Sequence, residues 1–380
     1  MAEKRSIFQE VETPGAAPVA PRGGMIDAGR RGARRGIRLW LIALFALVVV
    51  MIAVGGLTRL TDSGLSITEW RPLTGAIPPM NVADWQAEFK LYQAIPEFQA
   101  QNSWMSLEDF KVIYWWEWGH RQLGRFIGLV WAVGFFGFLA ARQIPAGWTG
   151  RLLLLGALGG AQGAVGWWMV YSGLGGDRTD VASYRLATHL GLAFVILGVI
   201  TWYVLLLSRP EREVMQSRRT REARLFGLGT GWMHLAFVQI LIGALVAGID
   251  AGRSYTEWPL MGGALWPQQM MVIEPWWRNF FENPGTVQFI HRMVGYVLLA
   301  FSIMAVMRGR RSAYVATRSA FTLAFWAVLA QIALGIVTVV LGAPWQVAIA
   351  HQFLAVIVWV LIIRARFHAG YPAAQSIRGK

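Results

Sequence analysis

Four histidines and one glutamate are the residues of this sequence whose positions best suit chemistry inside a membrane. His120, His189, His291 and His351 each lie near the start of a long apolar run, and Glu117 precedes the first of them by three residues. Ionisable side chains are costly within a bilayer and commonly mark functional sites there. Neutral imidazole is a frequent axial ligand of haem iron, so this pattern favours porphyrin binding if the chain brings the histidines together.

The elements that must position these side chains are eight apolar segments of about twenty residues, the length that crosses a hydrocarbon core as a helix. The chain of 380 residues is 55% hydrophobic and 15% charged, which excludes an ordinary soluble domain. We expect an all-α integral membrane protein with eight transmembrane helices in two pseudo-symmetric four-helix bundles. The expected spans are 39–60, 120–140, 152–172, 184–207, 225–249, 287–307, 319–341 and 345–366.

Basic residues set the expected orientation, because loops rich in Lys and Arg stay in the cytoplasm. Residues 1–38 hold eight basic side chains and the 208–224 linker holds six, whereas 61–119 holds three against eight acidic ones. We therefore place 1–38, 208–224 and the 367–380 tail in the cytoplasm, with both termini inside and 61–119 outside. The net charge of +14 is spread over the cytoplasmic loops, so it does not indicate a nucleic-acid partner.

The second half of the chain repeats the first, helix by helix, which predicts a duplicated four-helix unit. We assign 39–207 to an N-terminal half and 225–366 to a C-terminal half. Four pairs of segments match in the same order: GGLTRLTDSGLSITEW at 55–70 with GALVAGIDAGRSYTEW at 243–258, HRQLG at 120–124 with HRMVG at 291–295, AQGAVG at 161–166 with AQIALG at 330–335, and the helix of His189 with that of His351.

The four histidines occupy matched positions of this repeat, each in the first turns of a helix that runs inward, so they share one depth near the outer face. Side chains on facing helices of a bundle converge on its core. We therefore expect His120 with His189, and His291 with His351, to bind one haem iron between each pair. Two alternatives stay open: each imidazole could hydrogen-bond to a neighbouring helix, or bind zinc, although no third ligand recurs at a suitable spacing.

Charged residues beside the histidines suggest further roles. Arg121 and Arg292 could donate to haem propionates or anchor the helices at the membrane edge. Glu117 has Gln288 as its counterpart, so only the N-terminal half carries a titratable group one turn before the histidine. We expect Glu117 to take a proton or stabilise positive charge, which would make the N-terminal half catalytic. The alternative is that Glu117 is a solvated loop acid.

These motifs resemble the haem A synthase family. The resemblance covers most of 39–366, and its most specific parts are Glu-x-x-His-Arg at 117–121 and TEWRPLTGAIPP at 68–79. It implies an enzyme that oxidises a methyl group of haem O to a formyl group through hydroxylated intermediates, making haem A for cytochrome oxidase. The chain lacks the cysteine pair that some members carry, and thus resembles the cysteine-free subgroup of proteobacteria and mitochondria.

The resemblance also implies roles for the site residues. His291 and His351 would hold a haem B that passes electrons, while His120 and His189 would frame the substrate haem and Glu117 would assist the oxidation. Haem O synthase and cytochrome oxidase assembly factors are the implied partners besides membrane lipid, and a homo-oligomer is left open. Acidic residues in the N-terminal tail argue against a mitochondrial transit peptide, so we expect a bacterial inner membrane.

Two other classes of protein would suit part of this pattern. A non-catalytic di-haem membrane cytochrome would also need two pairs of histidines, and the contrast between Glu117 and Gln288 distinguishes it from an enzyme. A transporter would also show repeats, but the histidines lie too near the outer face for a midplane site.

Overall fold

The computed structural model describes residues 25–176 and 178–373, and these residues form helices and loops with no β-strand beyond one isolated bridge between Met261 and Ala264. Eight helices in these ranges are long and apolar enough to cross a membrane, which confirms the expected all-α fold with eight spans, while the arrangement in two pseudo-symmetric bundles stays a prediction. They are α1 (Met25–Leu60), α3 (Leu107–Ala140), α4 (Thr149–Tyr171), α5 (Ser183–Leu207), α7 (Ala223–Gly248), α9 (Pro284–Gly309), α10 (Val315–Val340) and α11 (Trp345–Gly370).

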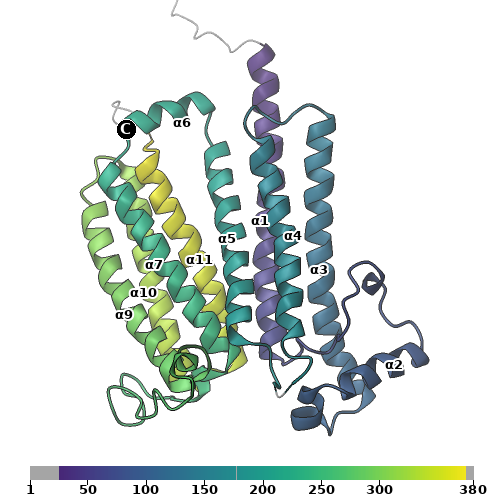
Figure 1. Ribbon diagram of the computed structural model, residues 1–380. Coiled ribbons are helices and arrows are strands. Elements are labelled where there is room, and N and C mark those ends of the chain that lie inside the picture. Colours follow the sequence, from purple (N-terminus) through teal and green to yellow (C-terminus); the bar gives the residue numbers. More distant parts are fainter. Residues whose placement is uncertain (1–24, 177, 374–380) are drawn as a thin grey trace, which may run out of the picture.

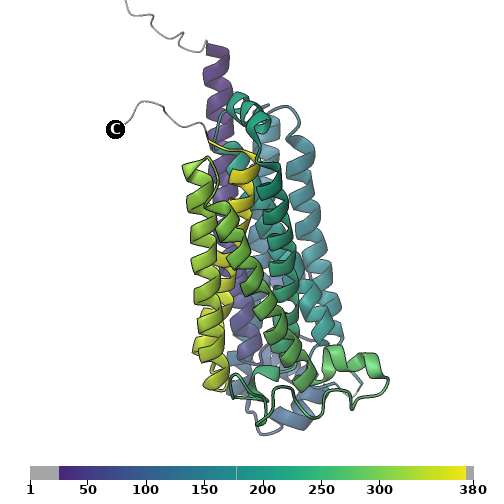
Figure 2. The same ribbon diagram turned by 90° about the vertical axis from the view of Figure 1, so that its left-hand side faces the viewer.

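The long helices lie side by side, and their connections gather at two ends of the molecule (Figures 1 and 2). One end holds α6 (Glu211–Ser217), η3 (Arg218–Thr220) and the last turns of α11. The other end holds the two long connections, which contain α2 (Val82–Gln93), η1 (Thr74–Ala76), η2 (Phe98–Asn102), η4 (Ala251–Arg253), η5 (Trp276–Arg278) and α8 (Asn279–Glu282). The basic 208–224 linker and the acidic 61–119 segment therefore lie at opposite ends, as the charge pattern requires.

Two helices extend into segments that we expected to be tails. α1 begins at Met25, so part of the predicted 1–38 tail is helical, and Arg34 donates to the carbonyl oxygens of Leu206 and Arg209 at 3.2 Å each. α11 continues to Gly370, so His368 lies in this helix rather than in the 367–380 tail. The rest of both predicted tails, 1–24 and 374–380, lies outside the described residues.

α3 corrects the expected 120–140 span. It begins at Leu107 and has 34 residues, which makes it about 51 Å long against about 30 Å for a hydrocarbon core. A capping box explains this start, because the Ser106 hydroxyl accepts from the Asp109 amide and the Asp109 carboxylate accepts from the Ser106 amide. His120 therefore lies more than three turns into its helix, not in the first turns as we predicted.

The projecting part of α3 carries a small apolar core of its own. α2 packs there, with Tyr92 and Phe110 both fully buried and their rings 5.3 Å apart. The outer connection is thus a folded cap on α3 rather than a helix lying on the membrane surface. The buried members of this core are Leu65, Ile67, Tyr92, Ile95, Phe110, Ile113, Tyr114 and Val170.

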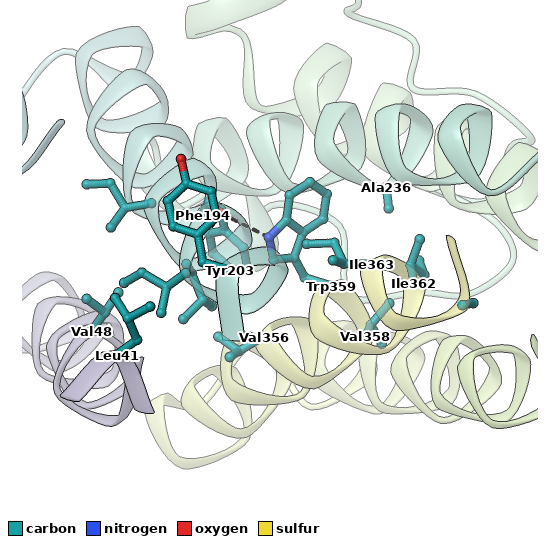
Figure 3. Packing of buried hydrophobic residues seen from close by; sticks show 14 of the residues in the cluster. Leu41, Val48, Phe194, Tyr203, Ala236, Val356, Val358, Trp359, Ile362 and Ile363 are labelled. Atoms are coloured by element: carbon teal, nitrogen blue, oxygen red, sulfur yellow. Dashed lines mark hydrogen bonds between the residues drawn. The ribbon is translucent and has the colours of Figure 1, made fainter. Parts of the chain in front are cut away.

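One continuous apolar core joins the two halves of the transmembrane region. It is centred on α5, in which 50% of the most apolar 18-residue stretch is buried inside the protein. α3 lies at the edge, because only 6% of its corresponding stretch is buried. Trp359 of α11 donates to the carbonyl oxygen of Phe194 in α5 at 2.9 Å, inside this core (Figure 3). The halves 39–207 and 225–366 therefore share one core, and their descent from a duplication remains a prediction.

Arg59 ties the two halves together at the loop-rich end. Its guanidinium donates to Asp62 at 2.7 Å and to Asp250 at 2.8 Å and lies 3.7 Å from Asp180, with 14% of the side chain exposed. Asp62 and Asp250 are repeat partners, and both have a left-handed backbone, with φ of 48° and 50°. Aspartate tolerates this conformation better than most residues, so the same turn follows α1 and α7, the first membrane helix of each half.

A buried acid lies in the folded cap of the outer connection. Glu97 is 4% exposed, accepts from the hydroxyl of Tyr92 at 3.3 Å and leaves its Oε2 without a partner. Burial, and then the nearby Asp180, raise the pKa of the Glu97 carboxyl from its ordinary 4.5 to about 8. The folded cap therefore holds a proton that the unfolded segment releases between these two pH values.

We predict that the stability of the cap falls as pH rises from about 4.5 to about 8 and then levels off, because only the unfolded segment ionises in that window. Thermal unfolding followed by tryptophan fluorescence at pH 6 and pH 9 should show this difference in wild type and not in Glu97→Gln. Glu108→Gln is the matched control, since that side chain is 78% exposed and should keep the wild-type pH dependence. If Glu97→Gln and Glu108→Gln show the same pH dependence, Glu97 is not the group that causes it.

Candidate functional site

Each of the four histidines packs against a glycine on the membrane helix that precedes its own. A Cβ atom added at three of these glycines would meet the imidazole Cε1 at 2.9 Å, closer than Cβ atoms approach in practice, and at Gly243 it would do so at 3.1 Å, which is tighter than most such contacts. Only glycine therefore lets each ring lie this close to the neighbouring backbone. The pairs are Gly55 of α1 with His120 of α3, Gly166 of α4 with His189 of α5, Gly243 of α7 with His291 of α9, and Gly335 of α10 with His351 of α11.

The structure brings the predicted histidine partners towards each other. His120 and His189 are near enough to interact electrostatically, and so are His291 and His351. The remaining histidines take no part in either pair. His234 is exposed on α7 with Nδ1 2.8 Å from the carbonyl oxygen of Thr230, and His368 lies at the opposite end of α11 from His351.

A glutamine stands beside three of the four imidazoles. In each case its Nε2 donates to the main-chain carbonyl oxygen of the histidine at 3.0 Å and lies 3.1–3.3 Å from both ring nitrogens. Its Oε1 is buried without a partner. The three pairs are Gln162 with His189, Gln239 with His291, and Gln331 with His351.

These glutamines were not among the residues predicted from the sequence, although the sequence contains a signal for them. We call each of the four glycines, together with the imidazole that packs against it, a histidine seat. Each glutamine lies four residues before the glycine of its seat, so the pattern Gln-x-x-x-Gly occurs at 162–166, 239–243 and 331–335. Residues at i and i+4 share one face of a helix, and both can therefore contact the same ring.

His120 is the exception. Four residues before its glycine stands Met51, and Nδ1 of His120 is buried without a hydrogen-bond partner. A Cβ at Gly124 would lie 3.5 Å from Cε of Met51, whereas a Cβ at the matched Gly295 would lie 3.5 Å from Nε2 of Gln239. Met51 thus occupies the place that a glutamine takes in the other seats.

Glu117 is buried in α3 one turn before His120, with 3% of the residue exposed, so the alternative of a solvated loop acid is wrong. Its Oε2 accepts from the Ser66 hydroxyl at 2.7 Å and the Ile67 amide at 2.8 Å. Its Oε1 accepts from Nε and Nη2 of Arg121 at 3.1 and 2.5 Å. Four donors on two oxygens fix the carboxylate and attach the outer connection above His120.

The C-terminal half makes the matching contact with inverted polarity. Gln288 donates through Nε2 to the carbonyl oxygen of Tyr255 at 3.0 Å, and Tyr255 is the repeat partner of Ile67. Where Glu117 accepts from a backbone amide, Gln288 donates to a backbone carbonyl. The predicted difference between Glu117 and Gln288 therefore decides whether an amide or a carbonyl group of the outer loop is bound.

The two predicted propionate ligands bind the outer loops. Arg121 donates through Nη2 to the carbonyl oxygen of Ile67 at 2.9 Å, and Arg292 donates through Nη2 to that of Tyr255 at 3.0 Å. A guanidinium has five N–H donors, so these bonds leave others available, and contact with propionates remains a prediction.

A cavity of about 470 Å³ lies between α3 and the outer connection, on the same side as Glu117. Arg71, Arg121 and Arg125 contribute to its lining, together with acidic and apolar side chains. Arg125 donates to the carbonyl oxygens of Arg71 and Pro72 at 3.0 Å each, and its Nη1 has no partner. The three arginines are balanced in the lining by Glu69, Asp84 and Glu88, and neither His120 nor His189 is part of it.

Known proteins resemble this chain along its whole length. A family profile described as "Cytochrome oxidase assembly protein" matches residues 38–363. A protein of Ruegeria pomeroyi named "Heme A synthase" is 68% identical over 381 residues, which is 100% of each chain. Proteins of the same name from Roseobacter denitrificans and Paracoccus denitrificans are 64% identical over 381 residues and 61% identical over 376, covering 100% and 99% of each chain.

We predict that Glu117→Gln loosens residues 66–69, because an amide nitrogen would face the donors that the carboxylate now accepts from. Breaking this largely buried ion pair should cost about 3 kcal/mol. Hydrogen exchange of the Ile67 amide, measured by mass spectrometry, should become faster. Glu108→Gln removes an exposed ion pair with Lys111 and should leave the exchange unchanged; unaltered exchange in Glu117→Gln would refute the anchoring role.

The glycine seats give a second prediction. In Gly166→Ala the new methyl group would lie 2.9 Å from Cε1 of His189, so the ring must shift. Such overpacking should cost about 1–3 kcal/mol in denaturant unfolding of the detergent-solubilised protein. Gly163→Ala, in the same helix with no atom within 4 Å of the added Cβ, should stay within about 0.5 kcal/mol of wild type. Equal stabilities would show that the seat is not tight.

Proposed function

The chain belongs to the cytochrome oxidase assembly protein family that matches residues 38–363, and on that premise we propose that it is a haem A synthase. As an oxidoreductase it would oxidise a methyl group of haem O to a formyl group through hydroxylated intermediates, and so make haem A for cytochrome oxidase. The relatives named "Heme A synthase", at 61–68% identity over nearly the whole of both chains, support this proposal.

The observation that carries the proposal is the pair of histidines at matched positions in each half. We propose that His291 and His351 ligate the iron of a haem B, and that His120 and His189 do so for the substrate haem. The residues fit such a group, because close-packed glycines hold the rings at fixed positions, while Nδ1 of His120 and three glutamine oxygens are buried with no partner. The two imidazoles of each pair would hold the iron of a porphyrin, whose own nitrogens would supply the remaining ligands, so no third protein ligand would be needed.

When bound, the haems would supply the redox chemistry, which is electron transfer in one half and oxidation of the substrate methyl in the other. Glu117 and Arg121 would hold the outer connection over the N-terminal pair. The buried carboxylate would also place a negative charge one turn from His120, where it stabilises positive charge. Its four hydrogen bonds favour this electrostatic role over transfer of a proton. The unpartnered Nη1 of Arg125 is the donor best left for a substrate carboxylate.

The chain is a multi-pass membrane protein, and we propose that it resides in a bacterial inner membrane with both termini in the cytoplasm. The six basic residues of the 208–224 linker and the acidic 61–119 segment at the opposite end support this orientation. Haem O synthase, cytochrome oxidase assembly factors and lipid are its proposed partners.

The direct test is to extract and identify the haems of the purified protein, by chromatography and mass spectrometry, after expression in a host that makes haem O. Haem A or its alcohol precursor beside haem B is the expected result. Haem B alone, in a host shown to supply haem O, would overturn the synthase proposal and favour a di-haem electron carrier.

The haem B site has a test of its own. His291→Ala and His351→Ala should each remove the haem B absorbance from the purified protein, because either change leaves the iron with one protein ligand. His234→Ala is the matched control, since that exposed histidine lies in the neighbouring helix α7 and belongs to neither pair. A retained haem B spectrum in the first two variants would refute the ligand assignment.

A further inference from the structure

The four histidine seats are alike except in the residue that stands four positions before the glycine. That residue is glutamine for His189, His291 and His351, and Met51 for His120. Both histidines of the C-terminal pair therefore have a glutamine beside them, whereas the N-terminal pair has one. This asymmetry coincides with the two roles proposed above, a resident haem B in one half and an exchanging substrate in the other.

The glutamines have the chemistry of partners that fix a ligand histidine. A histidine bound to a metal through one ring nitrogen commonly donates the N–H of the other to a nearby acceptor, which sets its tautomer and orientation. Each glutamine amide lies within 3.3 Å of both ring nitrogens, and each has an unpartnered Oε1. Here the histidine is held by the amide nitrogen, which donates to the main-chain carbonyl oxygen of the histidine at 3.0 Å and lies against the ring.

Met51 cannot do the same, because a thioether has no N–H group to donate. In agreement, Nδ1 of His120 is buried without a hydrogen-bond partner, a condition not found for the ring nitrogens of the other three seats. The helix that carries His120 is also the least enclosed, with 6% of its most apolar window buried against 50% for the helix of His189. His120 is therefore the least constrained of the four imidazoles.

We propose that Gln162, Gln239 and Gln331 are positioning residues that fix their histidines as iron ligands, and that Met51 leaves His120 as the exchangeable one. The N-terminal site would then release its haem, as a site for substrate and product must, while the C-terminal site keeps its haem. This inference rests on the proposed function, because it requires haem at both pairs.

The test exchanges the two residues between the halves. Met51→Gln, Gln239→Met and the double variant would be purified with their haems, and haem loss to excess apomyoglobin would be followed by absorbance. Haem B and the substrate-derived haems would be distinguished by their pyridine haemochrome spectra. Met51→Leu is the control that alters the side chain without adding an amide.

Met51→Gln should slow release of the N-terminal haem about tenfold or more, and Gln239→Met should speed release of haem B by a similar factor, the usual effect of an outer hydrogen bond on ligand binding. The double variant should reverse the order in which the two haems leave. A purely structural role of these residues would not produce that reversal.

Two results would overturn the inference while leaving the proposed function in place. One is equal release of the N-terminal haem from Met51→Gln and Met51→Leu. The other is wild-type retention of haem B by Gln239→Met. If Gln239→Met does not fold, the comparison of the two Met51 variants still decides. A wild-type protein that binds no haem at all would overturn the proposed function itself, and with it this inference.

Discussion

A histidine within a membrane-spanning helix is costly unless its ring is closely packed against its neighbours, and the helix pairs of this bundle meet that constraint at four places. The solution here is a pair of consecutive membrane helices in which the first provides a glycine and the second the histidine. The missing Cβ lets the helices approach until the ring meets the backbone, and a glutamine one turn earlier reaches the same ring in three of four cases. Two such pairs make each half, and the halves join through α5, α7 and α11 around the Trp359 and Phe194 contact.

The outer connections depend on a second constraint, which is that a buried charge needs several partners. Glu117 meets it by binding Arg121 and the backbone of the outer connection, and so links the segment 66–69 to the helix of His120. In the other half the neutral Gln288 makes the equivalent link to Tyr255 without a buried charge. The two halves thus differ in charge and in the constraint on one histidine, which is where different chemistry would require them to differ.

Length and hydropathy were sufficient to predict all eight spans, since the bilayer imposes one length on every helix that crosses it. They could not predict the projection of α3, because residues 107–119 bury aromatic side chains against α2 rather than facing lipid, and only the Ser106 capping box marks the start. The repeat located the histidines and the contrast between Glu117 and Gln288. Arg121 lies one turn from Glu117 on the same helix, but Ser66 and Ile67, its other partners, lie about fifty residues away in an irregular segment, and no local pattern indicates that contact. The glutamines recur in the sequence four residues before a glycine. Their role could not be predicted because the histidine that each one contacts lies on another helix.

We propose that each pair of histidines holds the iron of one haem. Near-infrared magnetic circular dichroism of the oxidised, purified protein tests this most directly, because charge-transfer bands of low-spin haem report the chemical identity of both axial ligands. For haem B in the C-terminal half of the wild-type protein, we expect the signature of two imidazole nitrogens. A signature with methionine, with water or with a single protein nitrogen would contradict it.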